Sequence, residues 1–248
     1  MIDPKSYHEE APQIDFNEFK KVVESRRSVR RYTKEAIPES VVREALRMAL
    51  LAPTSSNLQS WEFYWVRDSK KKKQLAHACL DQSAAKTAQE LIVCVARMDT
   101  WRRNAKLMVK ELEKTPYATK TLFAYYQKLV PIVYSVGILG ILAPLKWLMV
   151  NVWGLFRPMV RAPVWPSELK AWASVTTSLA CENLMLAFRA QGYDTCPMEG
   201  FDEVRVKKLL NLKSGAHVVM VISAGKRAQG GIYGYQIRLD PKNFIFEV

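Results

Sequence analysis

The chain has 248 residues, of which 49% are hydrophobic and 25% are charged, a composition that excludes intrinsic disorder as a description of the whole chain. Lysine and arginine outnumber aspartate and glutamate by 37 to 24, which gives a net charge of +13 at pH 7. This excess favours anionic partners such as a phosphate cofactor, nucleic acid or an acidic membrane surface.

The chain begins with a polar stretch, residues 1–14, that we expect to be a flexible leader. It has no apolar core, so we do not expect it to be a secretory signal. Cytoplasmic residence follows by default. The four cysteines and three histidines have no metal-binding spacing, so we expect reduced thiols and no metal site.

The chain then predicts helices that alternate with strands. Asp15 can cap a helix that starts at Phe16, and Ile37-Pro38 can open a second helix that stops at Pro53. The further expected elements are a strand at 61–66, one or two helices within 70–90, a buried strand at 91–96, a long charged helix at 101–128, an amphipathic helix at 167–191 that Gly192 caps, a short helix at 202–210 and a buried strand at 217–223. Strands separated by helices indicate an α/β or α+β architecture.

An unusually apolar segment lies at 129–160, where Lys146 is the one formal charge between Leu129 and Phe156. Its length would permit a membrane span, but prolines and glycines interrupt it, and two shorter pieces broken near Pro144 fit better. These pieces could cover a pocket or a dimer face, or they could lie in a membrane interface with tryptophans and arginines at the headgroups.

Four short segments carry residue types that suit a cofactor. SRRSVRRY, residues 25–32, offers guanidinium groups that bind phosphate, although a solvated basic face has the same composition. APTSSNLQSW, residues 52–61, offers donors and acceptors for a planar heterocycle, although an ordinary turn does so too. CPMEGF, residues 196–201, contains a glycine that permits close backbone approach, and YGYQIRLDP, residues 233–241, adds Arg238.

Together and in this order, these segments resemble the nitroreductase family of flavin enzymes, from about Phe19 to Pro241. The resemblance implies an α+β fold with a central, mostly antiparallel sheet flanked by helices, in an intertwined homodimer. It implies one FMN domain over 15–248 with an apolar insertion at about 129–165. It also implies a ping-pong reaction in which NAD(P)H gives a hydride to FMN, which then reduces a nitroaromatic, quinone or similar acceptor.

The resemblance carries the family's cofactor contacts onto this sequence. It assigns the phosphate and ribityl contacts to Arg26, Arg27, Ser28, Arg30 and Arg238. The flavin ring, or the loop that meets it, is assigned Pro53, Thr54, Ser55, Asn57, Gln59, Gln82, Pro197, Met198, Glu199 and Gly200, with a backbone N–H near Glu199 or Gly200 at flavin N5. No catalytic side chain and no metal are implied, because the flavin performs the hydride chemistry itself.

The sequence departs from the family pattern at Ser60, where proline is usual, at GKRAQGG after the last strand, and at the apolar insertion. The insertion bears on the acceptor, and its tryptophans favour a bulky aromatic or lipophilic one such as a quinone. A specialised flavin enzyme, such as a reductive dehalogenase or a flavin-destroying enzyme, is an alternative. A basic membrane-surface or nucleic-acid binding protein is another. The sequence has no nucleic-acid motif, so we expect no nucleic-acid partner.

Overall fold

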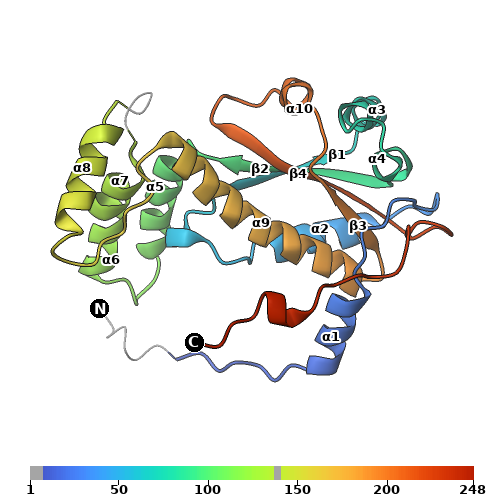
Figure 1. Cartoon of the computed structure of the whole chain (residues 1–248), viewed down its shortest axis with the longest axis horizontal. Coiled ribbons are helices and arrows are strands. Elements are labelled where there is room, and N and C mark those ends of the chain that lie inside the picture. Colours follow the sequence, from blue (N-terminus) through green and yellow to red (C-terminus); the bar gives the residue numbers. More distant parts are fainter. Residues whose placement is uncertain (1–7, 137–140) are drawn as a thin grey trace.

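The described residues form one four-stranded antiparallel sheet, with the strand order β1-β2-β4-β3 (Figure 1). The computed structural model describes residues 8–136 and 141–248. The strands are β1 (Trp61–Val66), β2 (Glu90–Arg97), β3 (Asp194–Met198) and β4 (Ala216–Gly225). The expected α+β fold with its antiparallel sheet is therefore confirmed.

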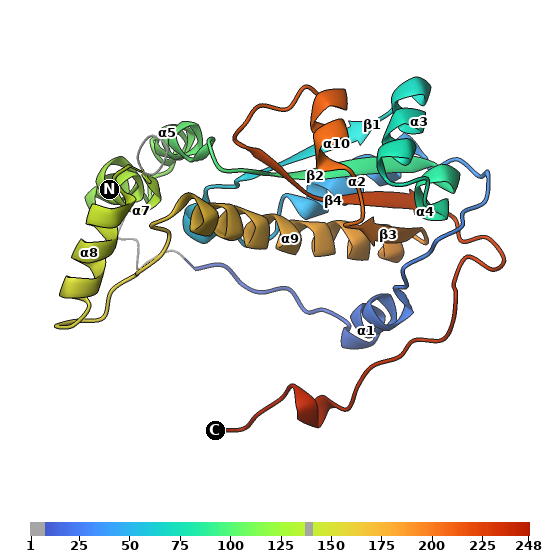
Figure 2. The same cartoon turned by 45° about the horizontal axis from the view of Figure 1, so that its top comes forward.

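Helices cover both faces of this sheet (Figure 2). Helices α2 (Glu39–Ala49) and α9 (Pro166–Ala190) lie on one face, while α3 (Ser69–Ala78), α4 (Ser83–Thr87) and α10 (Glu203–Leu209) lie on the other. Central strand β2 has no exposed residue, because Ile92 and Cys94 pack toward α9 whereas Leu91, Val93 and Val95 pack toward α3 and α10. This two-sided burial explains why its sequence is continuously apolar.

Edge strand β3 was not expected from the sequence. Its residues include Asp194 and Pro197, which are rare inside strands. Proline is tolerated at a sheet edge, where its missing N–H leaves no ladder partner unpaired, and β3 pairs only with β4 in the sheet. The edge position therefore allows a strand that composition argued against.

A second group of helices gathers at one end of the sheet. It consists of α5 (Trp101–Leu112), α6 (Lys120–Ala124), a π-helical turn η3 (Tyr125–Leu129), α7 (Val130–Tyr134) and α8 (Ala143–Trp153). The expected single helix over 101–128 is wrong, because the chain leaves the helix after Leu112 and re-enters it at a new cap, Thr119. The expected break near Pro144 is confirmed, since Pro144 lies in the first turn of α8. Residues 137–140 of the predicted insertion lie outside the described residues, and within the described part no helix is long and apolar enough to cross a membrane.

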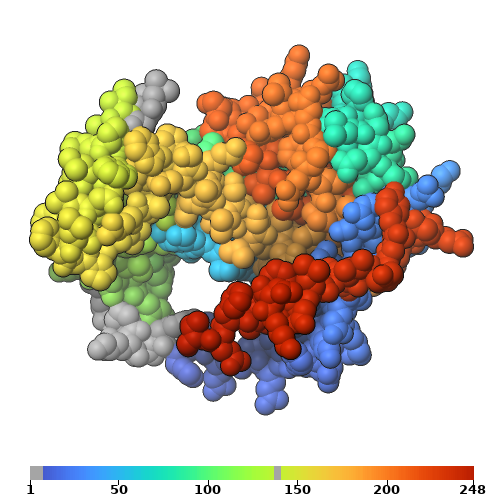
Figure 3. All heavy atoms as spheres, viewed as in Figure 1, coloured from blue at the N-terminus to red at the C-terminus, as the bar shows by residue number. Residues whose placement is uncertain are grey.

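Both ends of the described chain lie on the outside of this body. Helix α1 (Phe16–Ser25) is capped by Asp15, as expected, and buries none of its residues. The C-terminal tail leaves β4 and runs beside α1, with only the short turn η5 (Pro241–Asn243) in it (Figures 1 and 3). Residues 8–14 of the predicted leader are exposed and have no helix or strand, and residues 1–7 lie outside the described part.

Candidate functional site

A basic hollow of about 240 Å³ forms where the chain leaves α1 and meets the C-terminal tail. Its walls include four predicted phosphate-binding arginines from two segments more than 200 residues apart in sequence: Arg26, Arg27, Arg30 and Arg238, with Ser28 between them. The structure thus brings together the early and the late basic residues that the sequence singled out.

Backbone hydrogen bonds to the edge of the sheet hold the arginine segment in place. The N–H of Val29 donates to Thr195 O of β3 at 3.0 Å, and the N–H of Arg30 donates to Gly231 O at 2.7 Å. Within this segment, the side chain of Val29 is fully buried. Because alternate residues of an extended segment point to opposite sides, burial of Val29 turns Ser28 and Arg30 toward the hollow.

The hollow carries more positive charge than its own acidic residues offset. Arg26 forms an ion pair with Glu182 of α9 at 3.5 Å. Arg30 lies over the ring of Tyr233, 5.2 Å from its centroid, and Arg27 donates to the carbonyl of Gly234. Neither contact neutralises a guanidinium. The field also reaches β3, where burial raises the pKa of the Cys196 thiol and Arg30 and Arg26 partly offset that rise.

Asp194 anchors this corner. Its side chain is only 5% exposed and lies between Arg189 and Arg227, each with a nitrogen 2.7 Å from its Oδ1. Arg227 also donates to the carbonyl of Ser25, the last residue of α1, at 3.5 Å. The buried carboxylate therefore ties α9, the segment after β4 and the start of the arginine segment to one strand.

The predicted segment Pro197–Gly200 lies at the other end of β3. Pro197 and Met198 belong to the strand, and Glu199 and Gly200 form the exposed turn that follows it. Gln82, at the N-cap of α4, donates to the carbonyl of Gly200 at 2.7 Å. The structure thus places Gln82 beside this segment, and β3 leads from the basic hollow to both.

The predicted loop after α2 has an unusual backbone. Helix α2 ends at Ala49, short of the predicted Pro53, and a 3₁₀ turn, η2 (Ser55–Asn57), follows. Ser56, Asn57 and Gln59 have φ of 55°, 48° and 46°, the left-handed region that non-glycine residues seldom occupy. Strain of this kind persists only where surrounding contacts impose it, and it gathers at functional sites.

Three tyrosine hydroxyls from η3 and α7 hold Ser55 and Ser56 of this loop; we call them the tyrosine clamp, Tyr125, Tyr126 and Tyr134. Ser56 Oγ lies 2.6 Å from the Tyr125 hydroxyl and 2.9 Å from that of Tyr134, and the Tyr126 hydroxyl donates to Ser56 O at 3.1 Å. Ser55 Oγ adds a bond to Tyr134 at 3.1 Å. The π-helical turn η3 includes Tyr125 and Tyr126, and such turns occur often at functional positions.

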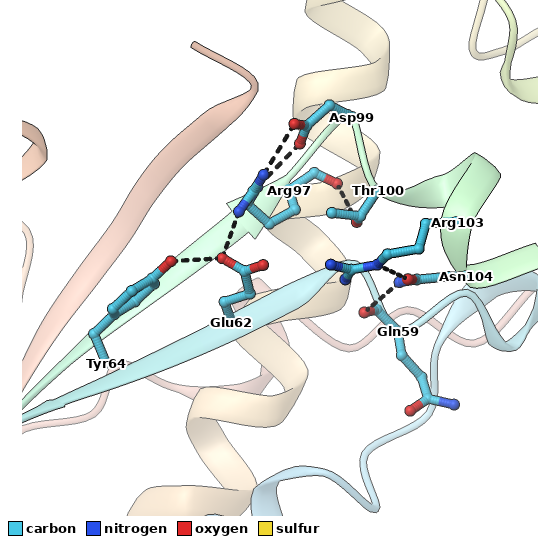
Figure 4. A network of polar contacts seen from close by, with 8 residues as sticks. All are labelled: Gln59, Glu62, Tyr64, Arg97, Asp99, Thr100, Arg103 and Asn104. Carbon is cyan, nitrogen blue, oxygen red and sulfur yellow. Dashed lines mark hydrogen bonds and ion pairs between the residues drawn. The ribbon is translucent and has the colours of Figure 1, made fainter. Parts of the chain in front are cut away.

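A polar network holds the far side of the same loop (Figure 4). Asn104 of α5 donates to the carbonyls of Leu58 and Gln59 at 2.7 and 3.3 Å. At the base of α5, Arg97 joins the two neighbouring carboxylates, at 2.6 Å from Glu62 and 2.9 Å from Asp99. The hydrogen bond from Arg97 lowers the pKa of Asp99 against the opposite effect of burial, and so favours the ionised carboxylate.

Removing two hydroxyls of the tyrosine clamp, by Tyr126→Phe with Tyr134→Phe, is expected to loosen this loop. These two hydroxyls make three hydrogen bonds, each of which contributes about 1 kcal/mol net. The free energy of unfolding should therefore fall by about 2–3 kcal/mol, and amide exchange at Ser55–Leu58 should accelerate. Urea denaturation and hydrogen exchange measure the two effects. Tyr235→Phe, at a tyrosine that is 84% exposed, is the control; an equal loss there would contradict the clamp.

Within one chain, the loop and the basic hollow lie apart. Leu58 packs in the same cluster as Leu169, near the start of α9, whereas Arg26 pairs with Glu182, further along this helix. At 1.5 Å per residue these two positions on α9 are about 20 Å apart. The views of the chain agree, with the loop toward α5 and the arginine segment beyond β3 (Figures 1 and 2).

Comparison with known proteins shows which family has this arrangement. The model of the nitroreductase family matches residues 23–226. The chain belongs to the nitroreductase family. Among curated nitroreductase relatives, the NADH dehydrogenase of Thermus thermophilus is 27% identical over 87% of this chain and 89% of its own. The oxygen-insensitive NADPH nitroreductase of Helicobacter pylori is 25% identical over 74% of this chain and 75% of its own.

A solved structure shows the same nitroreductase fold. A protein of Exiguobacterium sibiricum, solved in complex with FMN, superposes with a TM-score of 0.67 and 24% identity, over 93% of this chain and 97% of its own. The match covers almost the whole chain, and the family and fold that the sequence motifs implied are thus both confirmed.

Some residues that build the site escaped sequence analysis. We assigned no role to Asp194 or Asn104 from the sequence. Of the tyrosine clamp, Tyr125 and Tyr126 lie in the expected charged helix at 101–128, and Tyr134 lies in the apolar segment. The sole signal was the density of tyrosines at 125–134, which a buried hydrophobic core would equally explain. Across the described residues no group of histidine, cysteine and acidic side chains could hold a metal.

Proposed function

We propose that the protein is an FMN-dependent oxidoreductase that takes a hydride from NAD(P)H and reduces a nitroaromatic, quinone or similar acceptor by a ping-pong mechanism. The observation that carries the proposal is the convergence of four guanidinium groups on one hollow beside a sheet edge. Family membership supports the proposal. So do one structural neighbour, which was solved in complex with FMN, and one relative, which is named an NADPH nitroreductase.

The residues of the hollow fit the phosphate end of FMN. A phosphomonoester carries close to two negative charges near neutral pH, and Arg26, Arg27, Arg30 and Arg238 supply planar donors for its oxygens. Ser28 adds a hydroxyl. Glu182 offsets one of these four charges by pairing with Arg26, and a bound phosphate would offset about two of the remaining three.

The remaining predicted residues suit the flavin ring. With FMN bound, the hydride chemistry is the cofactor's own. Glu199 and Gly200 form an exposed turn at the end of β3, from which a backbone N–H can donate to flavin N5, and Gln82 holds that turn through the Gly200 carbonyl. The protein thus positions the ring and leaves an open face for the two substrates in turn.

We further propose that residues 15–248 form a single domain, with the insertion at about 129–165, and that two copies make the site. Leu58 of the loop packs in the cluster of Leu169, whereas Arg26 of the hollow pairs with Glu182, about 20 Å further along α9, so the partner's loop would face the flavin. Helix α1 and the tail expose apolar side chains that a second copy can cover, including Phe16, Phe19 and Phe244.

The purified protein tests this proposal. It should be yellow, release flavin on denaturation, and oxidise NADH or NADPH in the presence of a quinone or a nitroarene, with parallel lines in double-reciprocal plots. Turnover of halogenated phenols, in place of these acceptors, would instead indicate the specialised flavin enzyme. A colourless protein that takes up no added FMN would overturn the assignment.

A further inference from the structure

Helix α8 presents an apolar surface to the outside of the molecule. Ala143 is its one buried residue, while large side chains of the helix and the turn after it are exposed. We call these the α8 face: Leu145, Trp147, Leu148, Met149, Val152, Trp153, Leu155 and Phe156, with exposed fractions between 45% and 82%. A helix that is apolar all round belongs in a core or in lipid, so this face needs a cover.

The chain fixes α8 in this orientation through its single charged residue. Lys146 points inward, where its ammonium group donates to the carbonyls of Val133, Ser135 and Pro163 at 2.5, 3.3 and 2.7 Å. Burial lowers the pKa of Lys146, against a smaller opposite effect of Glu168. The one charge of α8 therefore serves to attach it to the body, and the apolar side chains are left pointing out.

The charges around the α8 face identify the kind of cover. Residues 141–164 contain no aspartate or glutamate, and arginines 157 and 161 follow the helix directly. Arg157 stacks on Trp153, 4.9 Å from its ring centroid, and Arg161 is fixed by Asn151 Oδ1 and Gly154 O at 2.8 and 2.9 Å. A surface with an apolar interior and anionic groups at its boundary matches this pattern, and tryptophan with arginine is typical of membrane interfaces.

The length of α8 decides how it would meet a membrane. Eleven residues rise about 16 Å, roughly half of a hydrocarbon core of about 30 Å. A helix of this length lies in the interface. Pairing of the α8 face with that of a second copy would add the arginines of both copies to a chain that already carries +13, so an anionic lipid surface suits the face better.

We propose that the α8 face docks the protein on an anionic membrane surface. The helix adjoins the predicted flavin loop, because Lys146 binds carbonyls at the end of α7 and Tyr134 of α7 binds Ser55 and Ser56. Docking would therefore bring the cofactor loop close to lipid. This inference rests on the proposed function. Given that function, the position of the loop makes a membrane-dissolved quinone the favoured acceptor.

Vesicle flotation of the purified flavin-loaded protein tests the docking. Vesicles of phosphatidylcholine with phosphatidylglycerol should carry the protein, and vesicles of phosphatidylcholine alone should carry much less. Phe156→Glu and Leu148→Glu should each weaken the partition coefficient at least tenfold, since burying such a side chain contributes about 1.5–3 kcal/mol. Arg157→Gln should weaken binding to the anionic vesicles about fivefold. Val204→Glu, on α10 and 77% exposed against 82% for Phe156, should have no effect.

Other outcomes would overturn the docking. Equal binding of Phe156→Glu and Val204→Glu would do so, as would absence of binding to either vesicle. A fall in molar mass of Phe156→Glu in light scattering would show instead that the face pairs two copies. Thermal denaturation confirms that each variant is folded. Turnover of a water-soluble quinone without vesicles is measured in parallel. If the protein turns over this quinone but binds no vesicles, the docking alone is refuted. If it binds vesicles but holds no flavin or has no turnover, the proposed function alone is refuted.

Discussion

Replacement of Arg26 and Arg30 by glutamine is expected to raise the Kd for FMN at least a hundredfold. A hydrogen bond to a charged group contributes about 1.5–3 kcal/mol, and each of these arginines lines the basic hollow. The glutamine side chains keep much of the packing and remove two positive charges. Titration of the apoprotein with FMN, followed by quenching of flavin fluorescence, measures the change.

Two controls isolate the phosphate. Arg31→Gln with Arg43→Gln removes the same charge from exposed positions outside the hollow, so it should leave the Kd almost unchanged. Riboflavin, which lacks the phosphate, should bind the wild-type protein weakly and lose little further affinity in the Arg26 and Arg30 variant. Equal losses for FMN and riboflavin would show that the two arginines do not read the phosphate.

Asp194→Ala is expected to lower the free energy of unfolding by about 3–5 kcal/mol, the usual cost of removing one partner of a buried ion pair. The carboxylate is 5% exposed and contacts both Arg189 and Arg227, so its loss leaves two guanidinium groups without their shared anion. Urea denaturation of the apoprotein measures the effect. Because Arg227 also binds Ser25 O, FMN affinity should fall too.

Asp194→Asn separates charge from shape in this prediction. The amide keeps one oxygen for a hydrogen bond, so the free energy of unfolding of this variant should lie between that of the wild-type protein and that of Asp194→Ala. Glu247→Ala, at an exposed glutamate of the tail, should change the free energy of unfolding by no more than about 0.5 kcal/mol. A similarly small change for Asp194→Ala would mean that the carboxylate does not anchor the corner.

The elements that periodicity and caps define were predictable from the sequence. The helix after Asp15, the alternating strand at 61–66 and the uncharged strand at 91–96 all form as expected. Strand β3 was missed because proline and aspartate are tolerated there only by its edge position. The helix expected over 101–128 was wrong because its charge pattern continues across a stretch where the chain turns and starts a new cap.

The segments of the candidate site can be marked from the sequence, but the contacts that support them cannot. Short motifs located the arginines, the loop and the turn after β3, since each is a continuous segment. The contacts that hold them, from Asp194, Asn104 and Tyr126, join segments distant in sequence. Such contacts depend on the tertiary arrangement, which one sequence without relatives does not specify.

The separation of loop and hollow along α9 has a genetic consequence. In the proposed dimer each cofactor lies between the hollow of one subunit and the loop of the other. A chain damaged in its arginines and a chain damaged in its loop are both inactive alone, yet a mixed dimer of the two has one doubly damaged site and one intact site. Co-expression of two dead alleles should therefore restore measurable activity.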